Sequence, residues 1–395
     1  MKNVALKLKP EPNKMKLNNL KAFFATAVEH NLPVALWHLP EDKNSYAITS
    51  FKGVQKEIID FEKLSGFIVS PFNSESDETN YISNDLIIDD SGFYKENAEI
   101  DKDNLKQFLE KYQANLSNQK INWFNNKDND YINYSKETYI DLIKKSIDYI
   151  KLGEIKKIVT SRTKVIDLKK DFNPINLFEK LSKKYHYAFI SLISIPNIGT
   201  WIGASPEILL KIEKDNLNTM SLASTQIYKG QAIEDVEWGL KEKEEQLTVT
   251  EYIEEKFINS KVKNYDKSIA KTIIAGNVLH IQTMFNYSSE NINKFATEFI
   301  KDFSPTPAVC GYPKDKAMKF LLDNELHKRN FYSGFIGTIN LFNQSNLFVN
   351  LRCMQLKEDK AIMYIGGGIT ADSIPEKEWY ETELKSQTLL SVINE

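Results

Sequence analysis

Short links between apolar, β-like runs are the feature that most restricts how this chain can fold. The links at 341–346 and 357–360 have hairpin length, which implies that the runs on either side pair in antiparallel fashion. The β-like runs of this region are 157–166, 187–195, 334–340, 347–355 and 361–366. They alternate with helical patterns at 135–152, 173–184, 241–258, 312–324 and 377–393. The sequence therefore predicts an α+β fold, a layered sandwich with large, mainly antiparallel sheets.

The first 130 residues carry less recognisable chemistry. A helical pattern at 17–30 precedes β-like runs at 33–39, 46–51 and 66–71. The stretch at 115–134 is rich in Asn, Asp, Gln and Lys, which predicts a surface connection. We therefore place a boundary near residue 130 and divide the chain into 1–130 and 131–395, the region that carries the recognisable chemistry.

Composition excludes several classes of protein. The chain has 395 residues, of which 42% are hydrophobic, so it can bury a sizeable core. Its 51 basic and 54 acidic residues are interspersed, which argues against a nucleic-acid partner. Cys310 and Cys353 lie far apart, so neither a zinc site nor a disulfide framework is expected. Without an apolar signal segment or an 18-residue apolar window, we expect a cytoplasmic protein with no membrane partner.

Two positions place an ionisable side chain next to apolar strands. Lys157 opens the run at 157–166, and burial or a neighbouring cation would leave such a lysine neutral and able to act as a general base. The alternative is an edge lysine that reaches solvent. Glu207 ends the turn Gly-Ala-Ser-Pro-Glu at 203–207, between two apolar runs. In an apolar pocket its carboxyl group would keep a proton and act as a general acid, whereas in a solvated turn it would be ionised.

Acidic residues on two helices are candidate metal ligands. Glu381 and Lys385 stand one helical turn apart and follow the glycines at 366–368. They form either an ordinary exposed ion pair or a site for a metal-bridged, carboxylate-bearing small molecule. Glu245 lies on the apolar stripe of another helix, where a carboxylate is unexpected unless it is paired or metal-bound. Together Glu245 and Glu381 could hold Mg²⁺, which commonly uses one or two protein carboxylates.

Other polar residues lie within apolar segments. His280 and Thr283 share one apolar run, where a histidine is either a catalytic group or a hydrogen-bonded core residue. The small, rigid loop Pro-Thr-Pro-Ala-Val-Cys-Gly at 305–311 either forms a pocket wall or only ends one element and begins another. Arg352, within the run 347–355, suits bidentate binding of a carboxylate, and a structural ion pair fits it equally well.

Taken in this order, these residues resemble the chorismate-utilising enzymes, the family that includes isochorismate, salicylate, anthranilate and aminodeoxychorismate synthases. The resemblance covers about residues 135–393. It is carried by 203–207, by 305–311, by Asn-Phe-Tyr-Ser-Gly-Phe-Ile-Gly at 330–337 and by Glu-Trp-Tyr-Glu-Thr-Glu-Leu-Lys at 378–385. It implies a fold like that of anthranilate synthase component I, with residues 1–130 as a variable N-terminal part of the same fold and chorismate bound by residues 131–395.

The resemblance implies a reaction with an acid and a base. Ammonia-using members of the family generally have glutamine where this chain has Lys157, and water-using members have lysine, so water is the expected nucleophile. Lys157 would take a proton from the water that attacks C2 of chorismate. Glu207 would protonate the departing C4 hydroxyl, and the product would be isochorismate. The implied activity is that of an isochorismate synthase, an isomerase.

The resemblance also implies how the substrate and its cofactor bind. Glu245 and Glu381 would ligate a Mg²⁺ ion that binds the ring carboxylate of chorismate. Lys385 and the amide of Gly366 would complete that contact, and Arg352 would hold the enolpyruvyl carboxylate. The other expected substrate-binding residues are Ser224, Thr225, His280, Thr283 and Ala308.

Two residues depart from the usual pattern of the family. In Leu-Ala-Ser-Thr at 222–225, Ser224 stands where glycine is usual, which places a Cβ beside the substrate. Ser304 stands where a histidine often precedes Pro-Thr-Pro. These departures motivate the hypothesis of a non-catalytic chorismate-binding paralogue, although the acid, base and metal positions are all filled. A Mg²⁺-dependent hydrolase would use the two glutamates but leave Lys157 and Glu207 unexplained.

The final product and the pathway have alternatives of their own. A salicylate synthase keeps the same lysine, forms isochorismate and then expels pyruvate. Isochorismate supplies either menaquinone or catechol siderophores, and a composition biased toward Lys, Asn and Ile, typical of an AT-rich bacterial gene, leads us to expect menaquinone. Related water-using enzymes are often monomers, so we expect a monomer.

Overall fold

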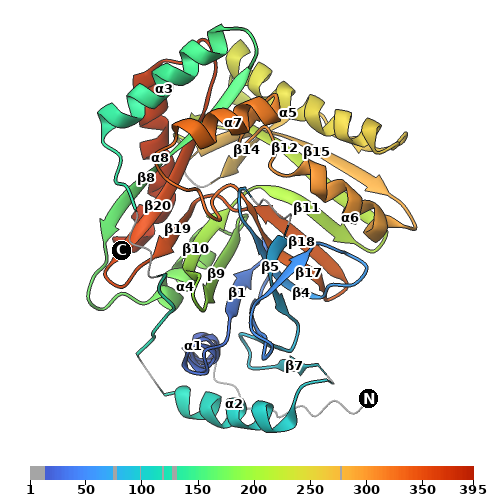
Figure 1. Ribbon diagram of the computed structural model, residues 1–395, viewed down its shortest axis with the longest axis vertical. Helices are drawn as coiled ribbons and strands as arrows, with labels where there is room; N and C mark the ends of the chain where they lie inside the picture. Colours follow the sequence, from blue (N-terminus) through green and yellow to red (C-terminus); the bar gives the residue numbers. More distant parts are fainter. Residues whose placement is uncertain (1–13, 74–77, 98, 118–119, 127–130, 276–277) are drawn as a thin grey trace.

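Two large sheets stacked face to face form the centre of the molecule, and helices cover them (Figure 1). The computed structural model describes residues 14–395 except 74–77, 98, 118–119, 127–130 and 276–277. Its helices are α1 (Lys14–Glu29), α2 (Lys102–Asn115), α3 (Lys136–Lys151), α4 (Pro174–Lys184), a 3-10 turn (Ile233–Asp235), α5 (Leu240–Asn259), α6 (Ile292–Phe303), α7 (Lys314–Asn324) and α8 (Pro375–Ile393).

Sheet I contains the strand that begins with Lys157 and the glycine-rich strand near the C-terminus. Its strand order is β16-β8-β20-β19-β10-β9-β1-β2-β6-β7. The strands are β16 (Gly311–Tyr312), β8 (Lys157–Asp167), β20 (Lys360–Ile369), β19 (Cys353–Leu356), β10 (Gly199–Ser205), β9 (Phe189–Ile195), β1 (Val34–His38), β2 (Ser45–Thr49), β6 (Leu86–Asp89) and β7 (Tyr94–Glu96).

Sheet II is the second large sheet and packs face to face against sheet I. Its order is β13-β15-β12-β11-β18-β17-β4-β5-β3, and β14 also pairs with β15. The strands are β13 (Asp266–Lys267), β15 (Val278–Ser288), β12 (Asn216–Ile227), β11 (Ile208–Glu213), β18 (Gln344–Val349), β17 (Phe335–Leu341), β4 (Gly66–Ser70), β5 (Glu78–Ser83), β3 (Gln55–Ile58) and β14 (Lys271–Ala275). Every strand pair among the described residues is antiparallel, as the short links predict.

Hydrophobic burial holds the layers together. Between the sheets, Phe189 of β9 stacks on Phe348 of β18 with ring centroids 4.3 Å apart, and Trp37 lies in the same cluster. Such an aromatic pair contributes roughly 1 kcal/mol beyond the area it buries. Helices α1, α4 and α8 pack on the outer face of sheet I, and α5 and α6 pack on sheet II. The molecule is therefore the α+β layered sandwich that the sequence predicts.

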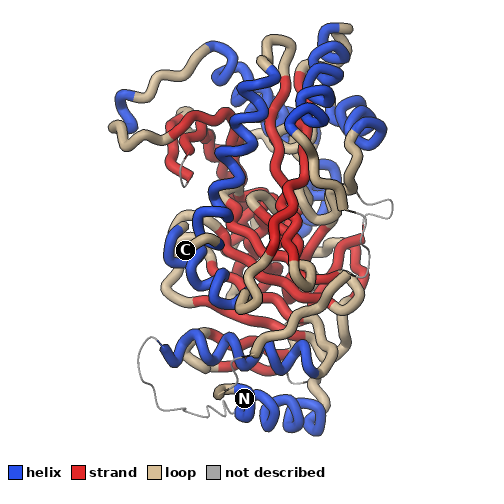
Figure 2. Tube along the Cα trace, turned by 90° about the vertical axis from the view of Figure 1, so that its left-hand side faces the viewer, coloured by secondary structure: helices blue, strands red, loops and turns tan. Residues whose placement is uncertain are grey.

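The N-terminal 130 residues extend both sheets instead of forming a separate unit. They supply β1, β2, β6 and β7 to sheet I and β3, β4 and β5 to sheet II. Figures 1 and 2 show α1 and α2 side by side at one end of the molecule, where α2 packs on α1. Parts of the expected N-terminal segment (1–13) and of the expected connection (118–119 and 127–130) lie outside the described residues.

Most expected elements occur within a few residues of their predicted bounds, and the structure adds strands that were not expected, among them β3, β5, β6, β7, β12 and β14. Helices α2 and α6 were not expected, and the single strand expected at 347–355 is wrong. The chain leaves sheet II after Val349 and enters sheet I at Cys353, and Arg352 between them has a φ of 49°. The largely apolar run at 347–355 hides this change of sheet because no glycine or proline marks it.

The helix that ends the chain begins with favourable terminal residues. Pro375 occupies the first turn of α8, where its missing N–H costs no hydrogen bond. Glu376 and Glu378 lie in the same turn, where a negative charge is stabilised by the helix dipole. This helix presents Glu378, Glu381 and Lys385 toward β20. Within the described part of the chain, no helix is long and apolar enough to cross a membrane.

Candidate active site

A cavity opens between the two sheets, with α5 and α8 on its sides. Its empty volume is about 800 Å³, including the opening to solvent. Strands β8, β12, β15 and β20, the β10–β11 turn and the loop before β16 supply its walls. Among the expected site residues, those that line the cavity are Lys157, Glu207, Ser224, Thr225, Glu245, His280, Ala308, Arg352, Gly366 and Lys385.

Two expected site residues are not among those that line the cavity. The hydroxyl of Thr283 is buried and accepts a hydrogen bond from Gln246 Nε2 at 2.8 Å, which places it behind the wall formed by β15 and α5. Glu381 is paired with Lys385 at 2.6 Å, and its Oε1 lies 3.8 Å from where a Cβ on Gly367 would stand. Glu381 therefore lies beside the glycine strand, next to the cavity.

Lys157 and Glu245 face each other across the base of the cavity. Lys157 Nζ lies 2.8 Å from Glu245 Oε1, and the lysine side chain is only 3% exposed. Burial alone would raise the pKa of Glu245, but the charge and hydrogen bond of Lys157, with Lys385 and Lys241, hold that pKa below its usual range. Glu245 is therefore a carboxylate at neutral pH.

Glu207 has the opposite protonation state. It lies in the turn between β10 and β11, 5% exposed, and its backbone oxygen accepts from the amide of Val349 at 3.0 Å. Burial raises the pKa of Glu207 to about 8, and the charges of Lys157, Lys385 and Arg352 oppose that rise. The carboxyl group thus keeps its proton at neutral pH and can donate it to a ligand in the cavity.

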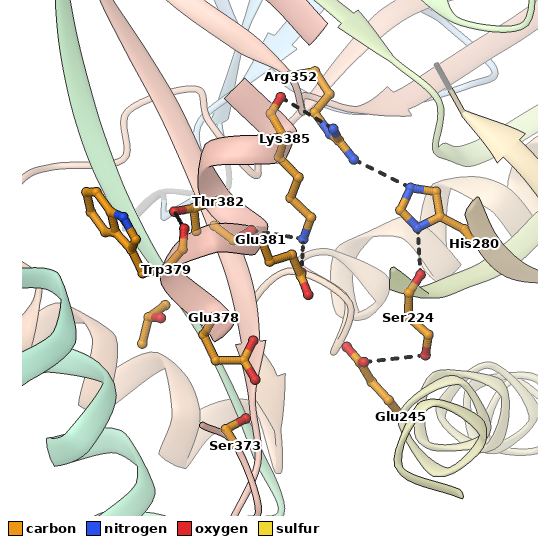
Figure 3. A network of polar contacts seen from close by, with 12 residues as sticks. Ser224, Glu245, His280, Arg352, Ser373, Glu378, Trp379, Glu381, Thr382 and Lys385 are labelled. Carbon is orange, nitrogen blue, oxygen red and sulfur yellow. Dashed lines mark hydrogen bonds and ion pairs between the residues drawn. The ribbon is translucent and has the colours of Figure 1, made fainter. Parts of the chain in front are cut away.

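His280 is held as a neutral imidazole. Its Nδ1 lies 2.7 Å from the backbone oxygen of Ser224, and because a carbonyl oxygen can only accept, Nδ1 carries the proton. Its Nε2 is then an acceptor and lies 3.5 Å from Arg352. Burial and the charge of Arg352 lower the pKa of His280 to about 3. Figure 3 shows this chain of contacts from Arg352 through His280 to Ser224.

Arg352 and Lys385 bring two positive charges to the same wall. The Arg352 guanidinium donates to Thr388 Oγ1 at 3.1 Å, on α8. Lys385 Nζ donates to the backbone oxygen of Gly366 at 3.0 Å as well as pairing with Glu381. In this structure the polar group of Gly366 that meets Lys385 is therefore its carbonyl oxygen. Both cations can bind a carboxylate that enters the cavity.

The glycines of β20 leave room beside these charged groups. A Cβ on Gly368 would lie 2.6 Å from Glu245 Oε1 and 2.9 Å from the Cε of Lys157. A Cβ on Gly366 would lie 2.6 Å from the hydroxyl of Tyr332. Any larger residue at these two positions would displace the site's side chains, so glycine is required by the close approach.

One acidic residue beside this site, Glu378, was not among the residues expected from the sequence. It is 4% exposed, lies one turn before Glu381 on α8, and pairs with Lys241 at 2.9 Å. Burial and the neighbouring charge of Glu381 raise the pKa of Glu378, and Lys241 opposes that rise. Its i,i+3 spacing from Glu381 was visible in the sequence and places both carboxylates on one helical face.

These glutamates have the chemistry of a divalent-cation site. Glu245, Glu378 and Glu381 point toward a shared space beside Gly367 and Gly368 (Figure 3). Each is paired with a lysine, and no three acidic, histidine or cysteine side chains among the described residues are close enough to hold a metal ion by themselves. Carboxylate oxygens nevertheless fit Mg²⁺, which completes its shell with water and substrate oxygens.

Comparison with known proteins identifies the family. The chorismate binding enzyme family matches residues 44–394. The chain belongs to that family. Anthranilate synthase component 1 of Aquifex aeolicus is 27% identical to it over 275 residues, which cover 66% of this chain and 54% of that protein. The vibriobactin-specific isochorismate synthase of Vibrio cholerae is 25% identical over 244 residues, 60% of this chain and 62% of that protein. The chain thus matches little more than half the length of these relatives.

Solved structures confirm the expected fold of this chorismate-binding enzyme. The menaquinone-specific isochorismate synthase of Escherichia coli has a TM-score of 0.76 at 18% identity, covering 94% of this chain and 91% of that one. Anthranilate synthase component I of Streptococcus pneumoniae has a TM-score of 0.66 at 17% identity, covering 98% and 95%. Both kinds of chorismate enzyme therefore share this fold.

The two departures from the family pattern lie in different places. Ser224 lines the cavity, whereas Ser304 is not among the described residues that line it. The backbone oxygen of Ser304 accepts a hydrogen bond from Lys314 Nζ at 2.9 Å. Of the two, only Ser224 can contact a bound ligand.

A second, unexpected set of residues supports the cavity from behind. Arg329 and Glu325 form a buried pair at 2.6 Å, with side chains 3% and 4% exposed. The Arg329 guanidinium also donates to the backbone oxygens of Val159 and Val309 at 2.6 and 2.8 Å. It therefore joins the strand that carries Lys157 to the loop that carries Ala308. No local sequence pattern indicated these contacts, which connect segments far apart in the chain.

Proposed function

We propose that this protein is an isochorismate synthase, which converts chorismate to isochorismate in a Mg²⁺-dependent reaction. The observation that carries the proposal is that Lys157 and Glu207 line one cavity, with Glu207 protonated at neutral pH. An addition of water coupled to loss of a hydroxyl group needs a base at one carbon and an acid at another. The resemblance of the chain to the water-using enzymes, which have lysine at this position, agrees with that assignment.

The proposed reaction balances without an additional reactant. Lys157 must first release to solvent the proton of its ion pair with Glu245; it then takes a proton from water as the water oxygen bonds to C2 of chorismate. The ring double bonds shift, the C4–O bond breaks, and Glu207 gives its proton to the departing hydroxyl, which leaves as water. One water enters and one leaves, so the product is an isomer of the substrate. Proton exchange with solvent then restores both groups.

The charged groups around the acid and the base would bind the two carboxylates of chorismate. We assign Arg352 to the enolpyruvyl carboxylate and Lys385 to the ring carboxylate. Glu245 and Glu381 would hold Mg²⁺. Glu378 lies beside Gly367, as Glu381 does, and is a third candidate ligand. When bound, Mg²⁺ would neutralise the charge of the ring carboxylate. The Nε2 of His280 accepts hydrogen bonds, so it can receive one from a substrate hydroxyl.

Thr225 and Ala308 line the same cavity and are assigned to substrate contact. Thr283 is assigned an indirect part, because its hydroxyl is held by Gln246, the residue next to Glu245 on α5. As the active form we propose a monomer, as expected from the water-using enzymes that the chain resembles. We propose that the product is used for menaquinone synthesis. Expression of this protein in a bacterial strain that lacks its own isochorismate synthase tests this, and menaquinone should be restored.

A product assay tests the proposal against the other activities of the family. Purified protein is incubated with chorismate, with and without Mg²⁺, and the products are separated by chromatography. Isochorismate without pyruvate, formed only with Mg²⁺, is the expected result. Salicylate with pyruvate would replace the proposal by a salicylate synthase. Anthranilate formed on addition of ammonium ion would contradict the role of Lys157, and no conversion would favour a non-catalytic chorismate-binding protein.

A further inference from the structure

Ser224 occupies an unusual backbone position in the wall of the cavity. It lies in β12, where the pairing with β15 shifts register between Ala223 and Gln226, and its φ is +65°. The side chain is 4% exposed. Residues other than glycine seldom adopt this left-handed region, so the surrounding contacts must hold Ser224 there.

The hydroxyl of Ser224 reaches the helix that carries Glu245. Its Oγ lies 2.5 Å from the backbone oxygen of Glu242 and 3.4 Å from Glu245 Oε2. A hydroxyl has a single proton, so it donates to the nearer oxygen in this structure and can turn toward the carboxylate when that carboxylate moves. The other oxygen of Glu245 is the one that pairs with Lys157. Both oxygens of this carboxylate are therefore adjacent to a hydrogen-bond donor.

The backbone oxygen of Ser224 positions His280, which lines the cavity. It accepts from His280 Nδ1 at 2.7 Å, and His280 Nε2 in turn meets Arg352 at 3.5 Å. The left-handed conformation of Ser224 lets its carbonyl group face His280 while its side chain faces α5 (Figure 3). A glycine could make the first contact but not the second.

We propose that Ser224 is a positioning residue whose hydroxyl orients the Glu245 carboxylate for a divalent cation. The inference rests on the proposed function, which assigns Glu245 as a metal ligand. Groups that hydrogen-bond to ligating carboxylates commonly change metal affinity about tenfold or more when they are removed. The serine that replaces the usual glycine would thus strengthen cation binding in this chain.

The test measures binding of Mn²⁺, a spectroscopic substitute for Mg²⁺, by electron paramagnetic resonance in the presence of chorismate. Ser224→Ala removes the hydroxyl and keeps the Cβ, and Ser224→Gly removes both. We expect both variants to raise the dissociation constant of Mn²⁺ about tenfold. Glycine accepts a positive φ readily, so Ser224→Gly keeps the test valid if Ser224→Ala folds poorly.

Ser221→Ala provides the matched control. Ser221 lies three residues earlier in β12, and its hydroxyl also contacts α5, through Thr250 at 2.8 Å and Gln246 at 3.0 Å, but not Glu245. Its removal loosens the same strand and helix without touching the proposed ligand, so the Mn²⁺ affinity should stay within about twofold of the original protein. Equal losses in Ser221→Ala and Ser224→Ala would overturn the inference in favour of a purely structural role.

The outcomes separate this inference from the proposed function. If isochorismate forms but the Ser224 variants bind Mn²⁺ as tightly as the original protein, the inference fails and the function stands. If no isochorismate forms but the Ser224 variants lose Mn²⁺ affinity selectively, the function fails and the positioning role stands. An original protein that binds no Mn²⁺ with chorismate present would overturn the inference.

Discussion

Lys157, the first residue of β8, and Glu245, on the facing side of α5, form a buried ion pair of 2.8 Å at the base of the cavity. The residue assigned as base is therefore held by a residue assigned as metal ligand. Gly368 of β20 lies against both side chains, and any larger residue there would collide with them. The proposed base and one proposed metal ligand consequently depend on one contact between sheet I and α5.

The first prediction concerns the base. Lys157→Ala should reduce kcat by about 10³-fold, the effect expected when a positioned proton acceptor is lost. Steady-state kinetics with chorismate measures the loss, and near-ultraviolet circular dichroism checks that the variant is folded. Lys164→Ala is the matched control, because Lys164 lies on the same strand and pairs with Glu383 outside the cavity. Activity close to that of the control would remove Lys157 from the mechanism.

The second prediction concerns the acid and its pH dependence. The pKa of Glu207 is raised to about 8, so its carboxyl group is protonated below that pH and ionised above it. Because only the protonated form can donate, kcat/KM should fall as the pH rises through about 8. Glu207→Gln cannot donate a proton and should lose about 10³-fold in kcat. A pH profile that stays level up to pH 9, or a Gln variant with near-normal kcat, would contradict the assignment.

The same shift makes a prediction about stability. The pKa of Glu207 is higher in the folded state than in the unfolded state, so at pH values between the two the folded protein holds a proton that the unfolded protein has released. The contribution of this group to the free energy of unfolding therefore falls as the pH rises toward about 8. Glu207→Gln removes that loss and should unfold at a higher urea concentration than the original protein at pH 8. Urea titrations at pH 6 and pH 8 measure it, and a difference of the opposite sign at pH 8 would show that the carboxyl group is already ionised when folded.

The third prediction concerns the metal ligands on α8. Glu381→Gln and Glu378→Gln should each raise the Mg²⁺ concentration needed for half-maximal activity about tenfold or more, since each removes a charged oxygen donor. Glu376→Gln, an exposed residue in the first turn of the same helix, is the control and should leave the requirement unchanged. An unchanged Mg²⁺ requirement in Glu381→Gln would exclude it as a ligand, and the same holds separately for Glu378.

The fourth prediction concerns the buried support of the cavity. Arg329→Met should lower the free energy of unfolding by about 3–5 kcal/mol, because it leaves Glu325 buried without its partner. Replacing both residues, as Arg329→Met with Glu325→Gln, should recover part of that loss. Urea titration of the original protein, the single variant and the double variant measures the free energy of unfolding of each. A single variant as stable as the original would mean that solvent reaches Glu325, contrary to its 4% exposure.

The sequence predicted those parts of the site that local patterns determine. Glu245 on an apolar helical stripe and Glu207 in a turn between apolar strands were unexpected polar residues, and both line the cavity. The short links between β17 and β18 and between β19 and β20 indicated antiparallel pairing, because a link of that length can join only antiparallel neighbours. Such signals depend on residues close together in the chain.

The residues that the sequence did not indicate depend on contacts between distant segments. Arg329 binds the backbone of β8 and of the 305–311 loop, and nothing near Arg329 in the chain marks those partners. Arg352 stands at the crossing between sheets, within a run whose apolar pattern suggests one continuous strand. Thr283 shares a strand with His280 but bonds to Gln246 behind the wall. In each case tertiary packing, which no local periodicity records, decides the result.

The most direct test of the account is the origin of the oxygen at C2 of the product. Chorismate is converted in water enriched in ¹⁸O, and the isochorismate is isolated and analysed by mass spectrometry. The account predicts one ¹⁸O atom in each product molecule, located at C2, because the attacking water comes from solvent. Isochorismate that carries only the original oxygen would mean that the C4 hydroxyl migrates within the molecule, and water attack assisted by Lys157 would be contradicted.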